Sequence, residues 1–229
     1  MPSQSLQRVA SYAISSSKRT AAPSFTLVIS EGSVINFDYP INPLSSAIIN
    51  AANVICLGGG GVDGAITEAG GRNLANDRLA LPLVSPDGAR CLTGSAAITG
   101  PNTYGKLKTP YVIHAVGPNF WDFVGRESEA DQLLRTAYLT SLELAKERRL
   151  EALGFSLISA GVYRGKKPIQ HILDIAVQTI KSFEGYEDLK EIHLCAFTKS
   201  ESAMLEEIAF RAGLSKIDVA NKSCCCSQS

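Results

Sequence analysis

The sequence predicts an α/β protein, in which strands and helices alternate along the chain. Short runs of β-branched and aromatic residues, such as Phe25–Ile29 and Phe155–Ile158, are typical of buried strands. Between such runs lie segments whose apolar residues recur at helical spacing, most clearly in residues 129–149. A further apolar run, Ala47–Ile49, leads into four consecutive glycines and then into a segment that can form a helix. This order places a glycine loop at a strand end, where open α/β sheets bind ligands.

In the first half of the chain, strands are predicted for residues 25–29 and 47–50, and a helix for residues 62–75. Residues 91–100 predict a turn followed by a strand. Residues 110–118 predict a further strand, which a Gly-Pro pair ends. His114 lies inside this apolar run, so we expect a core histidine rather than a catalyst.

In the second half, the amphipathic segment 129–149 should cover the sheet as a helix, and residues 155–158 should form a strand. Residues 167–183 predict another helix, because Pro168 suits its first turn and apolar residues recur at helical spacing. Residues 191–198 predict the last strand, and residues 201–212 a closing helix.

The two flanks of the chain carry weaker signals. Residues 1–23 predict an N-terminal extension that is either helical or disordered, because Leu6, Val9 and Ile14 have only rough helical spacing. Residues 217–229 predict a mobile, cysteine-rich tail. One domain is therefore expected over residues 24–216.

Length and charge limit the classes of function. At 229 residues the chain suits one sizeable domain. Twenty-two basic and 22 acidic residues balance, so no overall field favours nucleic acid or an anionic membrane. No apolar run approaches the length of a membrane-spanning helix, and the N-terminus lacks the apolar core of a signal peptide. We expect no specific nucleic-acid partner, no transmembrane segment, and a monomer.

The cysteines and histidines predict neither a disulfide framework nor a metal site. Cys56, Cys91 and Cys195 are scattered in apolar settings, whereas the other three crowd at residues 224–226. This distribution favours a reducing compartment, so a cytoplasmic or nuclear location is expected. The crowded terminal cysteines can accept a lipid. No Cys-x-x-Cys pair exists and the three histidines are far apart, so we expect no bound metal and no cofactor.

The stretch Asn50–Ile66 contains the most specific signal of the sequence. It reads Asn-Ala-Ala-Asn, then four glycines, then Val-Asp-Gly-Ala-Ile. Consecutive glycines let a ligand approach backbone N–H groups closely, and such groups at a helix N-terminus bind phosphate. No Gly-Lys-Ser/Thr follows, which excludes a Walker A loop, and no acidic strand end follows at the spacing of a dinucleotide fold.

Asp63 stands at the edge of this anion-binding loop. Its carboxylate can cap the following helix, or it can orient a water molecule or a ribose hydroxyl beside a bound phosphate. The local pattern supports the two interpretations about equally. The amides of Asn50 and Asn53, taken alone, more often satisfy loop backbone than bind a ligand.

This stretch resembles the signature loop of macrodomains, in particular the MacroD-type branch of ADP-ribosyl hydrolases and O-acetyl-ADP-ribose deacetylases. The string Val-Ile-His-Ala-Val-Gly-Pro at 112–118 and the run Ser159–Tyr163 also resemble segments of that family. The resemblance extends from about Phe25 to about Leu214. It implies a three-layer α/β/α fold with a central mixed, largely parallel sheet that binds ADP-ribose.

The resemblance also implies roles for individual residues. Asp63 and Asn53 would be catalytic, with Asn53 at the distal ribose and Asp63 orienting or deprotonating a water molecule. Tyr163 would cover a ribose and Phe197 would stack on adenine. The implied ADP-ribose-binding residues are Ser33, Val34, Ala52, Asn53, Gly60, Gly61, Val62, Asp63, Ser159, Ala160, Gly161, Val162, Tyr163 and Phe197.

Three positions depart from the family pattern. Ser33 replaces the Asp that accepts a hydrogen bond from the adenine amino group, so the charge that strengthens that bond is lost. Thr67 stands where the hydrolase branch often has His. Arg164 takes a usual glycine position, where it can pair with phosphate, block the loop or point to solvent.

The resemblance implies an enzyme that removes mono-ADP-ribose from acidic side chains or deacetylates O-acetyl-ADP-ribose. Its partners would be ADP-ribose and ADP-ribosylated proteins. A non-catalytic reader of ADP-ribose is the alternative that the three departures favour. Phosphatase activity on ADP-ribose 1″-phosphate is a further alternative, and a scaffold without ligand is disfavoured because both glycine-containing loops are present.

Overall fold

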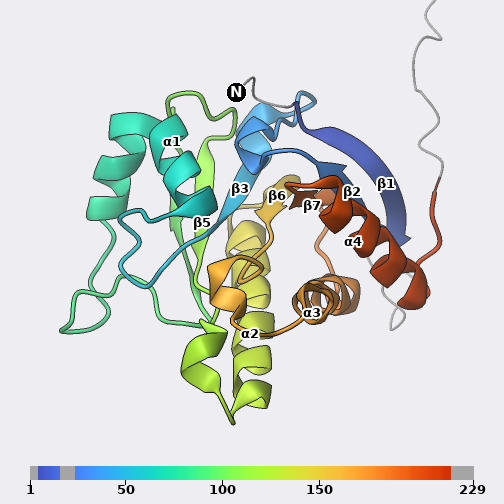
Figure 1. Ribbon diagram of the computed structural model, residues 1–229. Helices are drawn as coiled ribbons and strands as arrows, with labels where there is room; N and C mark the ends of the chain where they lie inside the picture. The colour runs from blue at the N-terminus through green and yellow to red at the C-terminus, as the bar shows by residue number, and fades with distance from the viewer. Residues whose placement is uncertain (1–4, 16–23, 218–229) are drawn as a thin grey trace, which may run out of the picture.

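A computed structural model describes residues 5–15 and 24–217 of the chain (Figure 1). These residues form a seven-stranded sheet in the order β1-β2-β7-β6-β3-β5-β4. Five strands in the middle run parallel, and the edge strands β1 and β4 are antiparallel to their neighbours. The strands are β1 (Gln7–Ile14), β2 (Phe25–Glu31), β3 (Ser46–Ala51), β4 (Ala96–Thr99), β5 (Tyr111–Ala115), β6 (Ala152–Ser156) and β7 (Glu191–Ala196).

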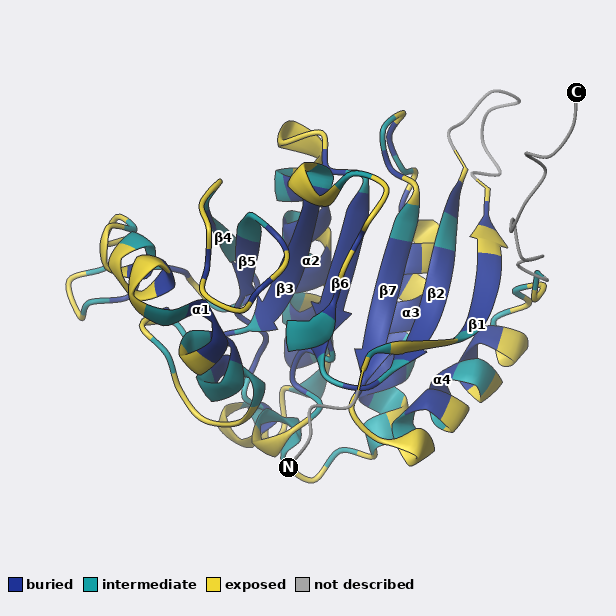
Figure 2. Cartoon of the chain, turned by 90° about the horizontal axis from the view of Figure 1, so that it is seen from above, coloured by how far each residue is buried: buried dark blue, intermediate teal, exposed yellow. Residues whose placement is uncertain are grey.

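Helices cover both faces of this sheet. The helices are α1 (Gly61–Leu79), α2 (Glu127–Glu147), α3 (Ile169–Ser182) and α4 (Lys199–Arg211). Successive side chains of a strand point to opposite faces. Ile49 of β3 accordingly packs in one core with α2, α3 and α4, whereas Ile48 packs in a second core with α1. The three-layer α/β/α fold with a mixed, largely parallel sheet is therefore confirmed, and Figure 2 shows its strands as a buried band.

The N-terminal segment corrects the sequence prediction. Gln7–Ile14 is neither helical nor disordered but forms β1, which pairs with β2 so that Tyr12 lies opposite Leu27. Ala10, Tyr12 and Ile14 alternate into the core, which is the period of a strand. The segment forms a strand because its apolar face packs on the core while its backbone pairs with the edge of β2. These contacts stabilise the strand more than the rough helical spacing favours a helix.

The remaining flanking residues, 1–4, 16–23 and 218–229, lie outside the described part of the chain. The predicted mobility and lipidation of the cysteine-rich tail fall there. Within the described residues, no helix is long and apolar enough to cross a membrane.

Helix α1 departs from its prediction in a way that matters for the site. It continues to Leu79, beyond the expected end at residue 75, and it is broken at Gly71, where φ is 62° and ψ is −155°. A positive φ of this kind is accessible to glycine without steric cost. The break lets the second part of α1 turn away from the axis of the first part.

The parallel strands direct their carboxyl ends to one edge of the sheet. The loops after β2, β3, β6 and β7 lie at this edge, and α1 begins there. In α/β sheets this is the edge at which ligands bind.

Candidate functional site

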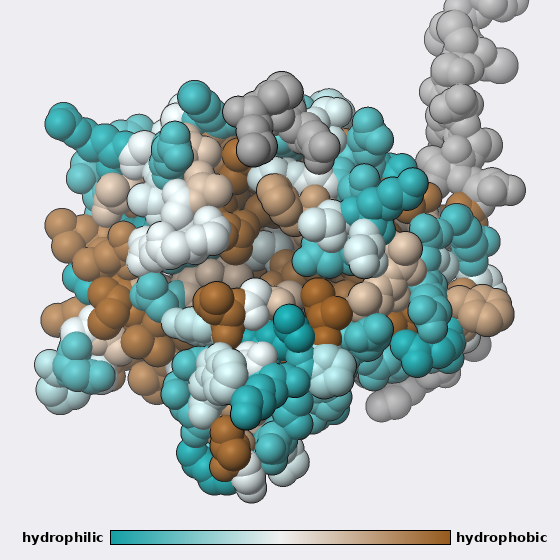
Figure 3. Space-filling model, in the orientation of Figure 1, coloured by the Kyte–Doolittle hydropathy of each residue, from teal (hydrophilic) through white to brown (hydrophobic). Residues whose placement is uncertain are grey.

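A cavity of about 440 Å³ opens at the carboxyl edge of the parallel strands. Its walls come from the loop after β2, the start of α1, the loop after β6, and the segment between β7 and α4. The face shown in Figure 3 is hollowed across its middle, with apolar residues along the margin. The lining residues are Gly32, Ser33, Val34, Gly61, Val62, Ala65, Ser156, Leu157, Ala160, Gly161, Cys195, Phe197 and Glu201.

The predicted binding residues divide into two groups around this cavity. Those that line it are Ser33, Val34, Gly61, Val62, Ala160, Gly161 and Phe197. Those that do not line it are Ala52, Asn53, Gly60, Asp63, Ser159, Val162 and Tyr163. Of the second group, Ser159, Val162 and Tyr163 lie in the segment after β6, and Asp63 lies in the first turn of α1. The remaining members, Ala52, Asn53 and Gly60, lie in the loop between β3 and α1, which reaches the cavity wall at Gly61.

The start of α1 has the features of an anion-binding helix terminus. Gly60 is the N-cap residue, and no side chain caps the helix there. The first N–H groups of a helix have no partner inside the helix, and the helix dipole places positive potential at this end. Gly61 and Val62 line the cavity at this point, so a bound phosphate can accept hydrogen bonds from this turn.

Asp63 is buried and does not cap α1. Its Oδ1 atom accepts hydrogen bonds from Asn50 Nδ2 and from Arg78 Nη2, both at 2.8 Å. Arg78 is fully buried, and its contact with Asp63 is a buried ion pair. The capping interpretation of Asp63 is therefore wrong. Sequence reasoning missed Arg78 because the residue lies 15 positions further along the chain.

The second carboxylate oxygen of Asp63 has a different setting. Oδ2 is buried and has no hydrogen-bond partner within the described residues. A methyl group placed on Gly59 would lie 3.0 Å from this atom and 3.1 Å from Asn53 Nδ2. Asp63 and Asn53, the two predicted catalytic residues, are thus brought together at the glycine loop.

Asn53 also organises its own loop. Its Oδ1 accepts hydrogen bonds from the backbone N–H groups of Ile55 and Cys56, at 3.1 and 3.2 Å. Its Nδ2 donates to the carbonyl of Gly58 at 2.9 Å. The amide therefore closes the turn that carries the chain into the glycines, in line with the structural interpretation of such amides.

The loop after β6 forms the wall opposite α1. Ser159 adopts a positive φ of 57°, and its hydroxyl donates to the carbonyl of Pro118 at 2.8 Å rather than facing the cavity. Val162 is exposed. Arg164 Nη1 donates to the backbone carbonyl of Lys167 at 2.6 Å, so the structure ties this side chain to its own loop.

The remaining wall carries a carboxylate that sequence reasoning missed. Glu201 lines the cavity together with Ser33 and the exposed Phe197. Its Oε2 accepts from the backbone N–H and the hydroxyl of Thr198, as part of a capping box at the start of α4. The Thr-x-x-Glu spacing predicts the cap of α4. No feature of the sequence near Glu201 indicates that this residue also lines a ligand cavity.

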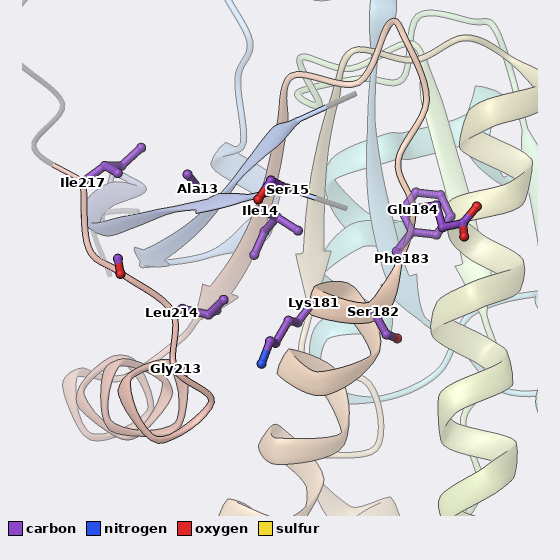
Figure 4. Close-up of a pocket in the computed structure, with 11 residues that line it drawn as sticks. Ala13, Ile14, Ser15, Lys181, Ser182, Phe183, Glu184, Gly213, Leu214 and Ile217 are labelled. Carbon is purple, nitrogen blue, oxygen red and sulfur yellow. The ribbon is translucent and has the colours of Figure 1, made fainter. Parts of the chain in front are cut away.

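A second cavity, of about 590 Å³, lies at the opposite edge of the sheet (Figure 4). It is bounded by the end of β1, the end of α3 and the segment after α4. Lys181 in its wall donates to the carbonyl of Ala212 at 2.6 Å. The cavity is remote from both glycine-containing loops, so its larger volume does not make it the candidate site.

The side chains of the described residues also bear on metal binding. In residues 5–15 and 24–217, no group of three or more His, Cys, Asp or Glu side chains is placed to hold a metal ion. The candidate site itself offers backbone N–H groups, the Asp63 carboxylate and the Asn53 amide.

Known proteins share this fold and this sequence pattern. A model of the Macro domain family matches residues 49–176, more than half of the chain. The O-acetyl-ADP-ribose deacetylase of Escherichia fergusonii is 38% identical over 167 residues, which are 72% of this chain and 88% of that protein.

Two solved structures resemble it closely. The Oceanobacillus iheyensis macrodomain with ADP has a TM-score of 0.69 and 29% identity, covering 89% of this chain and 98% of that one. The Trypanosoma brucei macrodomain in complex with ADP-ribose has a TM-score of 0.62 and 30% identity, covering 79% and 68%. The family model, the related sequence and the shared fold agree, and this chain belongs to the macro domain family.

Proposed function

We propose that this protein binds ADP-ribose in the cavity of about 440 Å³ and hydrolyses an ester at the distal ribose. The ester is either the acetyl group of O-acetyl-ADP-ribose or the link to an acidic side chain of a mono-ADP-ribosylated protein. One observation carries the proposal: Asp63 and Asn53 meet at Gly59, directly before the anion-binding start of α1. The ligand has a diphosphate next to a ribose ester, so its site needs a phosphate-binding turn and a carboxylate side by side. The glycine loop and the start of α1 provide both.

The walls of the cavity suggest how the ligand lies. The diphosphate would accept hydrogen bonds from the first turn of α1 on one side and from the backbone at Ala160–Gly161 on the other. The adenosine would then extend toward Ser33 and Phe197, and the distal ribose toward Gly59. The cavity volume falls within the range of small-molecule sites, about 300–1,000 Å³.

The chemistry would depend on positioning. Asp63 Oδ2, which has no partner in the described residues, would hold a water molecule or a ribose hydroxyl against the ester. Water supplies the attacking oxygen, and the leaving oxygen takes up a proton. Holding the two reactants in place can itself account for a large part of the rate.

Calorimetric titration with ADP-ribose tests the binding half of the proposal, with ADP and AMP as controls. Micromolar affinity for ADP-ribose and much weaker affinity for AMP are expected, because AMP lacks the diphosphate and the distal ribose. Absence of binding would refute the proposed site.

Turnover of O-acetyl-ADP-ribose and of a glutamate-linked ADP-ribosyl protein tests the catalytic half. Asp63→Asn keeps the size of the side chain and removes its charge, so turnover should fall far more than affinity for ADP-ribose. Equal loss of both would contradict the catalytic role of Asp63.

A reader of ADP-ribose without hydrolysis is the second candidate. The observation that favours it is Thr67, whose hydroxyl donates to the Asp63 carbonyl at 2.7 Å and accepts from Arg78 Nη1 at 2.7 Å. A threonine bound in this way supplies no acid or base. Tight binding with no turnover of either ester, or of ADP-ribose 1″-phosphate, would establish the reader.

A further inference from the structure

A buried cation lies directly behind the proposed catalytic carboxylate. The guanidinium of Arg78 is fully buried, with Nη2 at 2.8 Å from Asp63 Oδ1 and Nη1 at 2.7 Å from Thr67 Oγ1. Burying an ion is unfavourable unless an opposite charge and hydrogen bonds compensate it. Arg78 and Asp63 therefore stabilise each other, and neither can be understood alone.

The backbone of α1 is built to make this contact. In a straight helix, two residues 15 positions apart would be separated by about 22 Å along the axis. The break at Gly71, with its φ of 62°, turns the second part of α1 so that Arg78 returns to the first turn. The break at Gly71 interrupts a helix and buries an arginine, both of which are unfavourable. We therefore infer that the contact between Arg78 and Asp63 has a role of its own.

Thr67 and Arg78 share one space beneath the glycine loop. A methyl group on Gly58 would lie 3.1 Å from Thr67 Oγ1 and 3.7 Å from Arg78 Nη1. The short threonine side chain leaves the guanidinium room to reach Asp63. The residue that departs from the hydrolase pattern thus serves here as an acceptor for the arginine.

The hydrogen bonds of the neighbouring histidine can be assigned a direction. His114 Nδ1 lies 3.3 Å from Asn50 Nδ2 and 3.4 Å from Arg78 Nη2. Both neighbours can only donate, so Nδ1 is an acceptor and the ring proton is on Nε2, which donates to Thr99 Oγ1 at 3.1 Å. Burial lowers the pKa of His114 well below its ordinary value, and Arg78 lowers it further, so the ring is neutral.

This arrangement commits one oxygen of Asp63 and leaves the other available. Oδ1 receives two donors, from Asn50 and Arg78, and Asn50 is itself oriented by neutral His114. Oδ2 receives none from the described residues and faces Gly59. The carboxylate is consequently held in one orientation, with one oxygen directed at the glycine loop.

We propose that Arg78 is a positioning residue for the hydrolysis: its guanidinium holds Oδ1 of Asp63 and thereby directs Oδ2 at the distal ribose. This inference rests on the proposed function. With its orientation fixed, Asp63 accepts a hydrogen bond from the water molecule or the ribose hydroxyl and orients it against the ester.

The other titratable groups around the pair do not supply the same charge. His114 on β5 is neutral, and hydrogen bonding to Cys91, together with burial, raises the pKa of the Cys56 thiol, which stays protonated. Tyr104, which is close enough to Arg78 to feel its charge, donates to Asp77 Oδ2 at 2.7 Å. Arg78 is thus the cation that contacts Asp63 within residues 5–15 and 24–217.

The test compares Arg78→Met with the wild-type protein at pH 7. Methionine fills similar space but cannot donate, so Asp63 Oδ1 keeps only the hydrogen bond from Asn50 and the carboxylate loses its fixed orientation. The kcat for O-acetyl-ADP-ribose should therefore fall at least tenfold. Affinity for ADP-ribose should change less than threefold, because Arg78 does not line the cavity.

Arg78→Lys covers the case in which the methionine variant does not fold. Lysine keeps the charge but cannot bridge Asp63 and Thr67 as a planar guanidinium does. Its kcat should fall less than that of Arg78→Met, because one contact with Asp63 can remain while the bridge to Thr67 is lost, and its affinity for ADP-ribose should stay near that of wild type. Unchanged kcat in either folded variant, or parallel loss of kcat and affinity, would overturn the positioning role.

The wild-type protein separates this inference from the proposed function. If wild type turns over neither ester, the proposed function fails and the inference fails with it. If wild type is active and both arginine variants retain its kcat, the inference alone fails.

Discussion

The carboxylate of Asp63 and the side-chain amide of Asn53 meet on one side of Gly59, where a methyl group would lie 3.0 Å from Oδ2 and 3.1 Å from Nδ2. The residue at position 59 is therefore in close contact with both proposed catalytic groups. At Gly60, the next residue, no heavy atom of residues 5–15 and 24–217 lies within 4 Å of the corresponding point. Two adjacent glycines thus allow separate tests of catalysis and of ligand access.

Gly59→Ala should reduce turnover more than it reduces binding. The new methyl group must displace Asp63 Oδ2 or Asn53 Nδ2, because both distances are shorter than ordinary van der Waals contact. A displacement of a few tenths of an ångström at a reacting group should lower kcat about tenfold or more. Steady-state kinetics on O-acetyl-ADP-ribose measure the effect, and calorimetry with ADP-ribose serves as the control. A variant with wild-type kcat would show that the two side chains do not act at this point.

Gly60→Ala should weaken binding of ADP-ribose without cost to stability. Gly60 has φ of −93° and ψ of 178°, which alanine adopts readily, and the methyl group would have no heavy atom of the described residues within 4 Å. Such a change stabilises a folded chain by about 0.4–1 kcal/mol through the entropy of the unfolded state. The same methyl group would occupy the approach to the N-terminus of α1, so affinity for ADP-ribose should fall at least tenfold. Retained affinity would exclude this turn as the phosphate site.

Ser33→Asp should strengthen the recognition of adenine. Ser33 lines the cavity, and the family resemblance implies that an acidic residue at this position accepts from the adenine amino group. A hydrogen bond to a charged acceptor is stronger than one to a hydroxyl by about 1 kcal/mol, which corresponds to roughly fivefold in affinity. Calorimetry should show this gain for ADP-ribose and not for the analogue with hypoxanthine, which lacks the amino group. An equal gain for both ligands would mean that position 33 does not contact the base.

The parts of the fold that could be predicted are those whose signal is local. The parallel strands are buried on both faces, so they appear in the sequence as continuous apolar runs such as Ala47–Ile49. The glycine loop and the following helix are likewise contiguous in sequence. The edge strand β1 was missed because its alternation is confined to Ala10, Tyr12 and Ile14, and its stability depends on pairing with β2.

The parts of the site that could not be predicted depend on contacts between distant residues. Arg78 contacts Asp63 because α1 is broken at Gly71, and no local sequence pattern predicts this contact. Glu201 has a sufficient local explanation as the cap of α4, so its position at the cavity follows only from the packing of α4 near β7. The sequence left the roles of Thr67 and Arg164 open. In the structure Thr67 bonds to the Asp63 carbonyl and to Arg78, and Arg164 bonds to the Lys167 carbonyl.

Glu191 should contribute to stability above about pH 4.5 and lose that contribution as the pH falls toward 2. Burial alone would raise its pKa, but hydrogen bonds from His193 and Arg8 outweigh burial and lower the pKa to about 2. Because the folded value lies below that of the unfolded chain, protonation on acidification favours unfolding.

The contribution of Glu191 to the free energy of unfolding at pH 7 should be about 1–2 kcal/mol, after allowance for the partial exposure of the group. Thermal unfolding of Glu191→Gln should therefore show a melting temperature several degrees below wild type at pH 7, and the gap should nearly close by pH 2. Asp188→Asn is the matched control, because Asp188 forms an exposed ion pair with Arg149 and its removal should leave the melting temperature nearly unchanged at both pH values. A gap for Glu191→Gln that persists undiminished at pH 2 would show that the substitution acts through packing at the start of β7 and not through charge.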